Sequence, residues 1–377
     1  MERFKGLGAS YEVTFAKSHP LQAAPPTAPA ITADGVPIEL GACVDGLPDI
    51  TRALAFGAGA IGLLSTDALY LDRPDLPDEE EQYQDAIGVI QALGGRTATF
   101  LTLDLASDKL PRPARRPAGA NPALGMRSIR LSLARRDIFR TQLRALYRAS
   151  AAGPLRILFP LVSGVTEMAE ARSVCDEVCR ELCEQELPHD RHTPIGCMIE
   201  TPSAALTADH LARQSSFFNV GTNHLIQCCF GADRDNQDVA YLYQPLHPAV
   251  LRSLKLVADA ARSAGRPVAI SGDMAGDPAF VWILLGLGFR ELVVTPRHVP
   301  IIKSVIRASS LAEAERLTAV ALALGSEVEI EQLVLGAMGE LFGPDLFGSE
   351  LGLPVDFRFG DKDSNLDSQI QSLASCH

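Results

Sequence analysis

The sequence predicts an α/β protein whose parallel strands close into a (β/α)8 TIM barrel, followed by a helical C-terminal extension. Short apolar runs rich in β-branched residues alternate with longer segments of helical spacing, as in consecutive βαβ units. The runs number about eight, which favours a closed barrel over an open sheet. Polar residues directly follow nearly every run, as expected where the βα loops of a barrel build an active site.

The strand and helix candidates follow in regular order along the chain. The strand candidates are residues 37–44, 60–64, 97–103, 155–161, 195–199, 217–220, 267–270 and 291–295. Helical spacing is clearest in residues 135–149, 165–184, 249–264 and 299–307, and it continues from 309 to 340. Residues 121–130 fit either a short strand or a loop.

The two ends of the chain differ in composition from the part between them. Residues 16–30 hold four prolines among alanines, which predicts an extended linker that buries little surface. We expect residues 1–33 to form an N-terminal segment with this linker, and residues 34–345 to form the barrel. Residues 346–377 are expected to form a C-terminal tail whose polar end frays.

Composition argues against several classes of partner. Apolar residues make up 47% of the chain, enough for a large core, and the formal net charge is −12. An acidic surface repels nucleic acid and anionic lipid. The first ten residues contain no apolar signal segment, and the longest apolar run, residues 280–289, is about half of a membrane span. We expect a cytoplasmic protein with neither nucleic acid nor membrane as a partner.

Several motifs occur in an order that resembles one enzyme family. They are GAGAIGLLSTD (57–67), NPALGMRSIR (121–130), MIETPSAA (198–205), GTNHLIQ (221–227) and GDMAGD (272–277). Together they are similar to the motifs of the phosphoenolpyruvate-utilising enzymes, above all the substrate-binding barrel of enzyme I of the bacterial sugar phosphotransferase system. The resemblance covers about residues 34–316. It implies a TIM barrel of the phosphoenolpyruvate/pyruvate type without an organic cofactor.

The resemblance also implies a set of site residues. The family binds phosphoenolpyruvate through a divalent metal and a cluster of arginines, and it passes the phosphoryl group to a histidine on a mobile domain. Glu200 matches the first metal ligand, and Asn223 matches the asparagine that contacts the phosphate. Arg127 and Arg234 match two substrate-binding arginines, and Lys109 matches the end of the third-strand motif.

Other positions depart from the family pattern. Ser65 and Leu101 stand where the family has two arginines that hold the phosphate. His224 replaces the second metal ligand, an aspartate, and Ser271 replaces the cysteine that donates a proton. Each lost charged hydrogen bond is worth about 1.5–3 kcal/mol, so phosphate binding should weaken markedly. Ser18-His19-Pro20 is not the glycine-rich histidine motif, so we expect the mobile histidine domain to be missing.

Two interpretations stay open at each of the most altered positions. Glu200 and His224 together suit a softer ion than magnesium, such as Mn, Fe, Co or Zn. Alternatively, the metal is lost and His224 is a hydrogen-bonding side chain or a general acid/base. Ser271 either orients a substrate oxygen or fills a small space. Ser65 lies in the former phosphate-binding position.

The residues support three functional hypotheses. The first is an enzyme of altered enolate or 2-oxo-acid chemistry that binds a pyruvate- or phosphoenolpyruvate-like carboxylic acid, with histidine phosphotransfer impaired. The second is a non-catalytic regulatory or scaffold homologue of enzyme I. The third is a phosphoenolpyruvate–protein phosphotransferase that uses a histidine domain on another chain, which makes a carrier protein its partner. The resemblance also implies a homodimer formed through the barrel.

Overall fold

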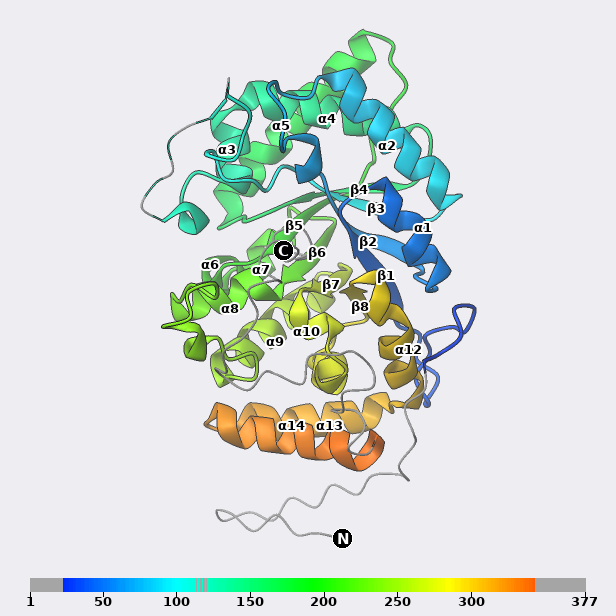
Figure 1. Cartoon of the computed structure of the whole chain (residues 1–377), viewed down its shortest axis with the longest axis vertical. Coiled ribbons are helices and arrows are strands. Elements are labelled where there is room, and N and C mark those ends of the chain that lie inside the picture. The colour runs from blue at the N-terminus through cyan, green and yellow to red at the C-terminus, as the bar shows by residue number, and fades with distance from the viewer. Residues whose placement is uncertain (1–22, 113, 116, 118, 120, 343–377) are drawn as a thin grey trace.

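Eight parallel strands form one closed barrel in the computed structural model, which describes residues 23–112, 114, 115, 117, 119 and 121–342 (Figure 1). Each strand pairs with the next one along the chain, and β8 pairs with β1 to close the ring. The predicted (β/α)8 barrel is confirmed. The strands are β1 Glu39–Val44, β2 Ala60–Ser65, β3 Ala98–Leu101, β4 Leu155–Phe159, β5 Ile195–Ile199, β6 Phe217–Gly221, β7 Val268–Ser271 and β8 Glu291–Val294.

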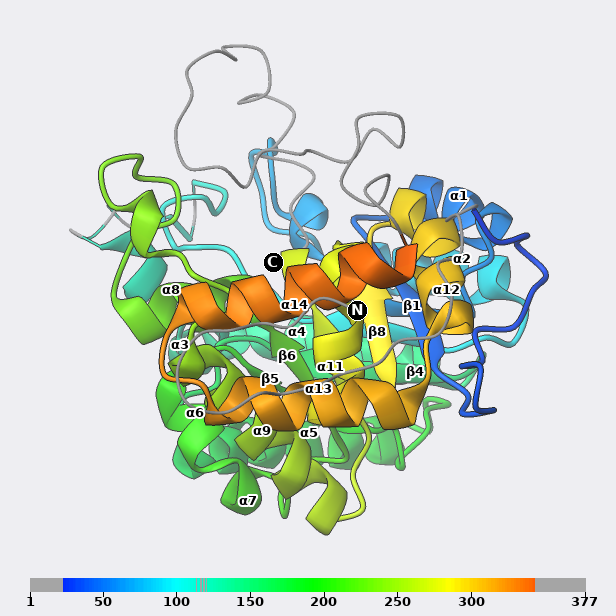
Figure 2. The same cartoon turned by 90° about the horizontal axis from the view of Figure 1, so that it is seen from below.

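Helices surround the barrel and fill the connections between strands. They are α1 Leu47–Ala55, α2 Glu79–Leu93, α3 Ser128–Ala134, α4 Arg136–Ser150, α5 Val165–Glu184, α6 Pro202–Leu206, α7 Ala208–Leu211, α8 Thr222–Phe230, α9 Pro248–Ser263, α10 Asp273–Gly276, α11 Val281–Leu287, α12 Val299–Ala308, α13 Leu311–Ala323 and α14 Glu327–Phe342. The last two form the predicted helical extension, and they lie side by side along one side of the barrel, where α13 packs on α11 (Figures 1 and 2).

The strands read as apolar runs because both of their faces are buried. Side chains that point outward pack under the helices in the main core. Side chains that point inward form a second core that takes one residue from each strand, so the barrel is filled rather than open. These inward residues are Cys43, Leu63, Leu101, Leu158, Met198, Phe217, Ala269 and Val293.

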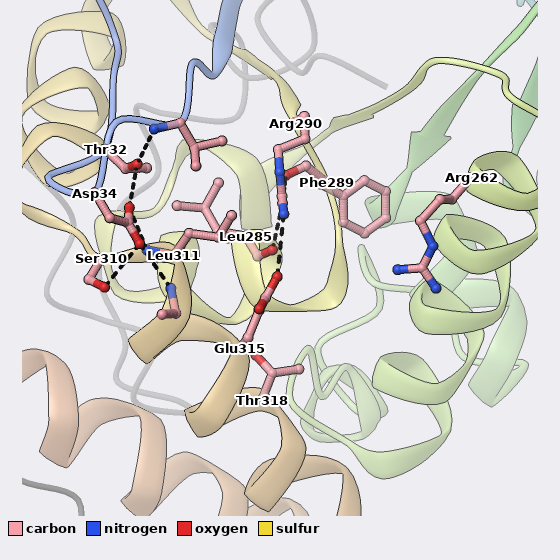
Figure 3. Close-up of polar contacts among 12 residues, drawn as sticks. Thr32, Asp34, Arg262, Leu285, Phe289, Arg290, Ser310, Leu311, Glu315 and Thr318 are labelled. Carbon is pink, nitrogen blue, oxygen red and sulfur yellow. Dashed lines mark hydrogen bonds and ion pairs between the residues drawn. The ribbon is translucent and has the colours of Figure 1, made fainter.

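Asp34 joins the segment before β1 to the start of α13 (Figure 3). Its carboxylate accepts hydrogen bonds from the backbone N–H groups of Leu311 at 3.0 Å and Ala312 at 3.1 Å, and from the Thr32 hydroxyl at 2.6 Å. Desolvation acts to raise the pKa of Asp34, but these hydrogen bonds outweigh it and lower the pKa below its ordinary value. Asp34 therefore satisfies N–H groups that the first turn of a helix leaves unpaired.

Two segments adopt structures that the sequence pattern left open or described differently. Within residues 121–130, a 3-10 turn spans Pro122–Leu124, and a single β-bridge joins Ala106 to Arg127 before α3 begins. The described part of the proline-rich segment packs on the barrel, since Ala24 is 8% exposed and its N–H donates to the Pro300 carbonyl at 3.1 Å. Residues 16–22, including the Ser18-His19-Pro20 sequence, and the tail 346–377 lie outside the described residues.

The sequence predicts that this protein has no membrane as a partner, and the length and composition of the described helices bear on this prediction. Across these residues, no helix combines the length and the apolar character that crossing a bilayer requires.

Candidate active site

The carboxyl ends of the strands carry most of the predicted site residues. Glu200 directly follows β5, whereas Asn223 and His224 lie in the first turn of α8, immediately after β6. Ser271 and Ser65 are the last residues of β7 and β2. Because all strands are parallel, these positions share one mouth of the barrel.

Glu200 and His224 form a buried hydrogen-bonded pair. Glu200 is fully buried, and its Oε1 lies 2.8 Å from His224 Nδ1. Its Oε2 accepts the backbone N–H of Leu161 at 2.7 Å. Both carboxylate oxygens therefore have a partner. When Glu200 is ionised, it can only accept, so Nδ1 carries the hydrogen and the other ring nitrogen, Nε2, becomes the acceptor.

The backbone around this pair is shaped to fit it. Leu161 has a φ of 54°, a left-handed conformation that is uncommon for a bulky residue and that occurs most often at functional sites. At Gly221 any larger residue would place its Cβ 2.8 Å from Glu200 Oε1, so this position requires glycine.

Asn223 lies beside the pair and is almost completely buried. Its Oδ1 accepts the backbone N–H of Asp273 at 2.9 Å and the Tyr243 hydroxyl at 3.3 Å. Within the described residues its side-chain nitrogen, Nδ2, has no hydrogen-bond partner. A Cβ at Gly272, which has a φ of 97°, would lie 2.7 Å from Asn223 Oδ1. The chain therefore holds an unused donor in a fixed place.

Arg127 belongs to a second polar cluster, which joins the loops after β2 and β3. Its Nη2 donates to the Asp104 carbonyl at 3.0 Å and lies 3.3 Å from Asp104 Oδ1. The Asp104 N–H donates to Asp67 Oδ1 at 2.8 Å. Burial acts to lower the pKa of Arg127, but the charges of Asp104, Glu200 and Asp67 outweigh it and raise this pKa. Glu200 is one of the charges that raise this pKa, so Arg127 lies within electrostatic reach of the Glu200–His224 pair.

Asp67 has an unusual protonation equilibrium. Burial, followed by the neighbouring charge of Asp104, raises the pKa of the Asp67 carboxyl far above its ordinary value. Ser65 supports this residue, since its hydroxyl oxygen accepts the Asp67 N–H at 3.3 Å. Leu101 occupies the neighbouring strand end and packs into the inner core of the barrel.

Arg234 reaches the cluster through Tyr243. Burial, followed by the charge of Asp273, raises the pKa of the Tyr243 hydroxyl, whereas the charge and a hydrogen bond of Arg234 act to lower it. Arg234 also lies 3.8 Å from the exposed carboxylate of Asp235. Lys109 is exposed, and across the described residues no hydrogen bond or ion pair connects its side chain to the cluster. The structure thus brings Arg234 to the site but not Lys109.

Ser271 lies deeper than the other site residues. It is fully buried, and its hydroxyl donates to Asn219 Oδ1 at 2.8 Å. The side-chain nitrogen of Asn219 has no hydrogen-bond partner among the described residues. Sequence reasoning missed Asn219 and Tyr243 as site residues. A single asparagine within the apolar run of β6, FFNVG, was the signal that could have indicated the first of them.

The donor set is small for a metal ion. Throughout the part of the chain that the structure describes, no group of three or more His, Cys, Asp or Glu side chains is arranged to hold one. Glu200 and His224 are the two proposed ligands, and their facing atoms are hydrogen-bonded to each other.

Comparison with known proteins gives a consistent result over most of the chain. The family model described as "PEP-utilising enzyme, PEP-binding domain" matches residues 20–311. A phosphoenolpyruvate-protein phosphotransferase of Bacillus sp. (strain S) is 40% identical over 304 residues, which cover 81% of this chain and 53% of that protein. The corresponding enzyme of Haemophilus influenzae is 39% identical over 306 residues, covering 81% and 53%.

Two further matches complete the comparison. A multiphosphoryl transfer protein of Xanthomonas campestris pv. campestris is 40% identical over 313 residues, which cover 83% of this chain and 37% of that protein. Among solved structures, a citrate lyase of Burkholderia xenovorans LB400 aligns over 86% of this chain and 99% of its own, with a TM-score of 0.44 and 18% identity. The chain spans about half the length of the phosphotransferases it matches. It belongs to the family of phosphoenolpyruvate-utilising enzymes, through their substrate-binding domain.

Proposed function

We propose that this barrel binds a pyruvate- or phosphoenolpyruvate-like carboxylic acid at its mouth and that classical phosphoryl transfer to histidine is impaired. The observation that carries the proposal is the uneven set of cations at the mouth. Arg127 and Arg234 are present, whereas Ser65 and the apolar Leu101 lie at two strand ends where the resemblance implies arginines. Such a site retains groups for a carboxylate and has lost groups for a phosphate.

Ligand binding in this proposal uses both charge and an unused donor. Arg127 and Arg234 supply positive charge for the carboxylate. Asn223 Nδ2 is buried without a partner among the described residues, and leaving such a donor unpaired costs about 1–3 kcal/mol. A ligand oxygen that accepts this N–H removes the cost, which makes Asn223 a selective contact for an oxygen-rich acid.

The Glu200–His224 pair supplies acid–base chemistry in this proposal. With its hydrogen on Nδ1, His224 can accept a proton at Nε2 from the methyl carbon of a 2-oxo acid, which leaves an enolate, and can return it afterwards. Glu200 is fully buried against the ring and stabilises the charge that His224 gains. Ser271 acts here as a positioning residue, because its hydroxyl contacts Asn219 at 2.8 Å.

A divalent metal does not fit the donor set as the structure has it. Magnesium sites usually combine several waters with one or two protein carboxylates, yet the one carboxylate proposed here is already engaged, since one oxygen of Glu200 accepts Leu161 N–H and the other faces His224. A softer ion such as Mn, Fe, Co or Zn would have to break the Glu200–His224 hydrogen bond. We therefore derive no step through a metal. Thermal-shift measurements with each of these ions test whether the site binds a divalent metal. An ion that stabilises the wild type but not Glu200→Ala would show that Glu200 does bind a metal.

Calorimetry with pyruvate, phosphoenolpyruvate and larger 2-oxo acids tests the main proposal. Arg234→Ala should weaken binding of the preferred acid at least about tenfold, which corresponds to one lost charged hydrogen bond. The control is Arg96→Ala, which removes an exposed arginine just before β3, at the end of the barrel opposite the mouth, and should leave affinity unchanged. The proposal fails if no acid binds the wild type at millimolar concentration.

The named relatives favour a second candidate function. They are phosphoenolpyruvate-protein phosphotransferases, and about 40% identity supports a phosphotransferase that acts with a histidine domain and a carrier protein. Incubation with labelled phosphoenolpyruvate and histidine domains from these relatives separates the two. We expect no label transfer. Label transfer that disappears in Arg127→Ala would favour this second function. A protein that neither transfers the label nor exchanges the methyl protons of a 2-oxo acid with solvent would instead be a non-catalytic scaffold.

By analogy with enzyme I, we propose a homodimer formed through the barrel and a cytoplasmic location. Light scattering after size-exclusion chromatography tests the first, since a single monomeric mass at micromolar concentration would exclude it. Fractionation of cells that express the tagged full-length protein tests the second.

A further inference from the structure

A cavity of about 430 Å³ opens on the outside of the barrel, far along the strands from the candidate active site. It lies between α5, the segment that leads into β6, and the residue range just before β7. Residues 213–216 and Arg266 directly precede β6 and β7, whereas the site residues follow their strands, so this part of the cavity belongs to the end of the parallel barrel opposite the mouth. In Figure 2, α5, α7 and α9 lie close together in this part of the outer ring.

Three arginines line this cavity, which we call the arginine cavity. They are Arg172 on α5, Arg213 after α7, and Arg266 before β7. Asp176 is the one acidic residue of its lining. Within the described residues, no ion pair connects any of the three arginines to a carboxylate. A concentration of positive charge in a protein with a net charge of −12 indicates attraction for an anion.

Backbone contacts hold two of these arginines in place. Arg172 Nη1 donates to the Gln214 carbonyl at 2.9 Å, and Arg266 Nε donates to the Ala212 carbonyl at 3.2 Å. A guanidinium has five N–H groups, so most of its donors stay available after one such bond. Arg213 is exposed and adds a third guanidinium beside them. Preorganised arginines lose little conformational entropy when an anion binds.

Unpaired polar atoms provide an independent indication of a ligand. Ser215 lines the arginine cavity and is only 2% exposed, yet its hydroxyl has no hydrogen-bond partner among the described residues. The side-chain oxygen of Gln214, in the same lining, is also buried and unpaired there. Buried polar groups are nearly always hydrogen-bonded, so two adjacent exceptions in one cavity suggest that a bound molecule satisfies them.

We propose that the arginine cavity binds the phosphate group of a small hydroxylated phosphate monoester. Guanidinium forks match phosphate oxygens in geometry and charge, and the Ser215 hydroxyl can donate to the same group. Asp176 would repel a second anionic group, but it can accept hydrogen bonds from hydroxyl groups of the organic part. The volume falls within the usual range for small-molecule sites. The ligand at this cavity does not compete with the acid at the mouth.

Isothermal titration of the full chain with glycerol 3-phosphate, inorganic phosphate and succinate at constant ionic strength tests the proposal. We expect saturable binding of glycerol 3-phosphate, weaker binding of inorganic phosphate and none of succinate. Arg213→Ala should weaken binding about tenfold or more, because one charged contact is lost. Arg180→Ala is the matched control on α5, since Arg180 is exposed and does not line the cavity. Ser215→Ala should weaken binding without lowering thermal stability.

Two further measurements separate this cavity from the mouth. Arg234→Ala, which weakens the site at the mouth, should leave glycerol 3-phosphate binding unchanged. Amide resonances of residues 212–216 should shift during the titration, whereas those of Asn223 and His224 should not. The proposal is overturned if no phosphate compound saturates, if succinate binds equally well, or if Arg180→Ala and Arg213→Ala have the same effect.

Discussion

Replacing Glu200 by glutamine would reveal whether this carboxylate determines the position of the proton on His224. Glutamine has the same shape but offers one oxygen and one NH2 group. The Leu161 N–H, 2.7 Å from Oε2, can only donate, so the amide oxygen must turn toward it. The NH2 group then faces His224 Nδ1, which lies 2.8 Å from Oε1. His224 has to give up its hydrogen on Nδ1 and carry it on Nε2.

The expected stability loss follows from the contacts that change. In Glu200→Gln two hydrogen bonds to a charged acceptor become neutral, and charged bonds are about twice as strong, so the loss should be about 2 kcal/mol. Glu200→Ala leaves both donors unpaired in a fully buried place, which should cost about 3–5 kcal/mol. Proton acceptance by Nε2 should disappear in Glu200→Gln, whose NH2 group faces Nδ1, but not in Glu200→Ala, which has no donor there.

Two assays measure these effects. Urea unfolding gives the difference in free energy between the variants and the wild type. Nitrogen NMR of histidine-labelled protein at pH 8 identifies the tautomer, with His224→Asn used to assign the signal. The reasoning is refuted if Glu200→Ala unfolds within about 1 kcal/mol of the wild type, or if the His224 hydrogen stays on Nδ1 in Glu200→Gln.

Three further changes test other contacts. Gly272→Ala puts a Cβ 2.7 Å from Asn223 Oδ1 at a φ of 97° and should lower the free energy of unfolding in urea by about 2–3 kcal/mol. The control is Gly265→Ala, at a φ of 64° with open space around it, which should lower that free energy by only about 1 kcal/mol. Equal losses in the two variants would disprove the steric argument. Burial raises the pKa of Asp67 to about 7, so the folded state retains a proton that the unfolded state loses above about pH 4. Wild-type stability should therefore fall relative to Asp67→Asn by about 2 kcal/mol between pH 5 and 7.5, and a constant difference would contradict the shift. Asp34→Ala removes the acceptor of the Leu311 and Ala312 N–H groups, while Ser310 still accepts the Glu313 N–H as the N-cap of α13. This variant should lower stability by about 1 kcal/mol and speed hydrogen exchange at residues 311 and 312, and Asp34→Asn should lose less. Unchanged exchange would show that these contacts are not needed.

The sequence predicted the barrel well because its signals are local. Each strand is a short apolar run that is buried on both faces, and that pattern does not depend on distant residues. The third strand was predicted to residue 103 but ends at Leu101, since the chain beyond it turns into the Asp104 cluster. Residues 121–130 could not be assigned, because a 3-10 turn and one bridge produce no periodic pattern.

The site was less predictable, because its contacts join side chains from different loops. Proximity of Glu200 and His224 followed from two adjacent strand ends, and the structure brings them to 2.8 Å. The hydrogen bonds of Glu200 to His224 and to the Leu161 N–H depend on backbone dihedrals, such as the φ of 54° at Leu161, and no sequence motif specifies these. Tyr243 lies 20 residues beyond Asn223, in a loop whose path is set by tertiary packing. Lys109 matched a motif, but its exposed side chain does not join the cluster.

The Asp34 contact has a consequence for how the barrel opens. A ring of strands has no free edge, and the pairing of β1 with β8 is the place where its first and last members meet. Asp34 stands just ahead of β1, and the helix that it caps comes after β8. The two sides of that junction are thus tied by a second, independent link. Separation of β1 from β8 should carry α13 with it, so local opening at this junction should be rare and should coincide with loss of the whole fold.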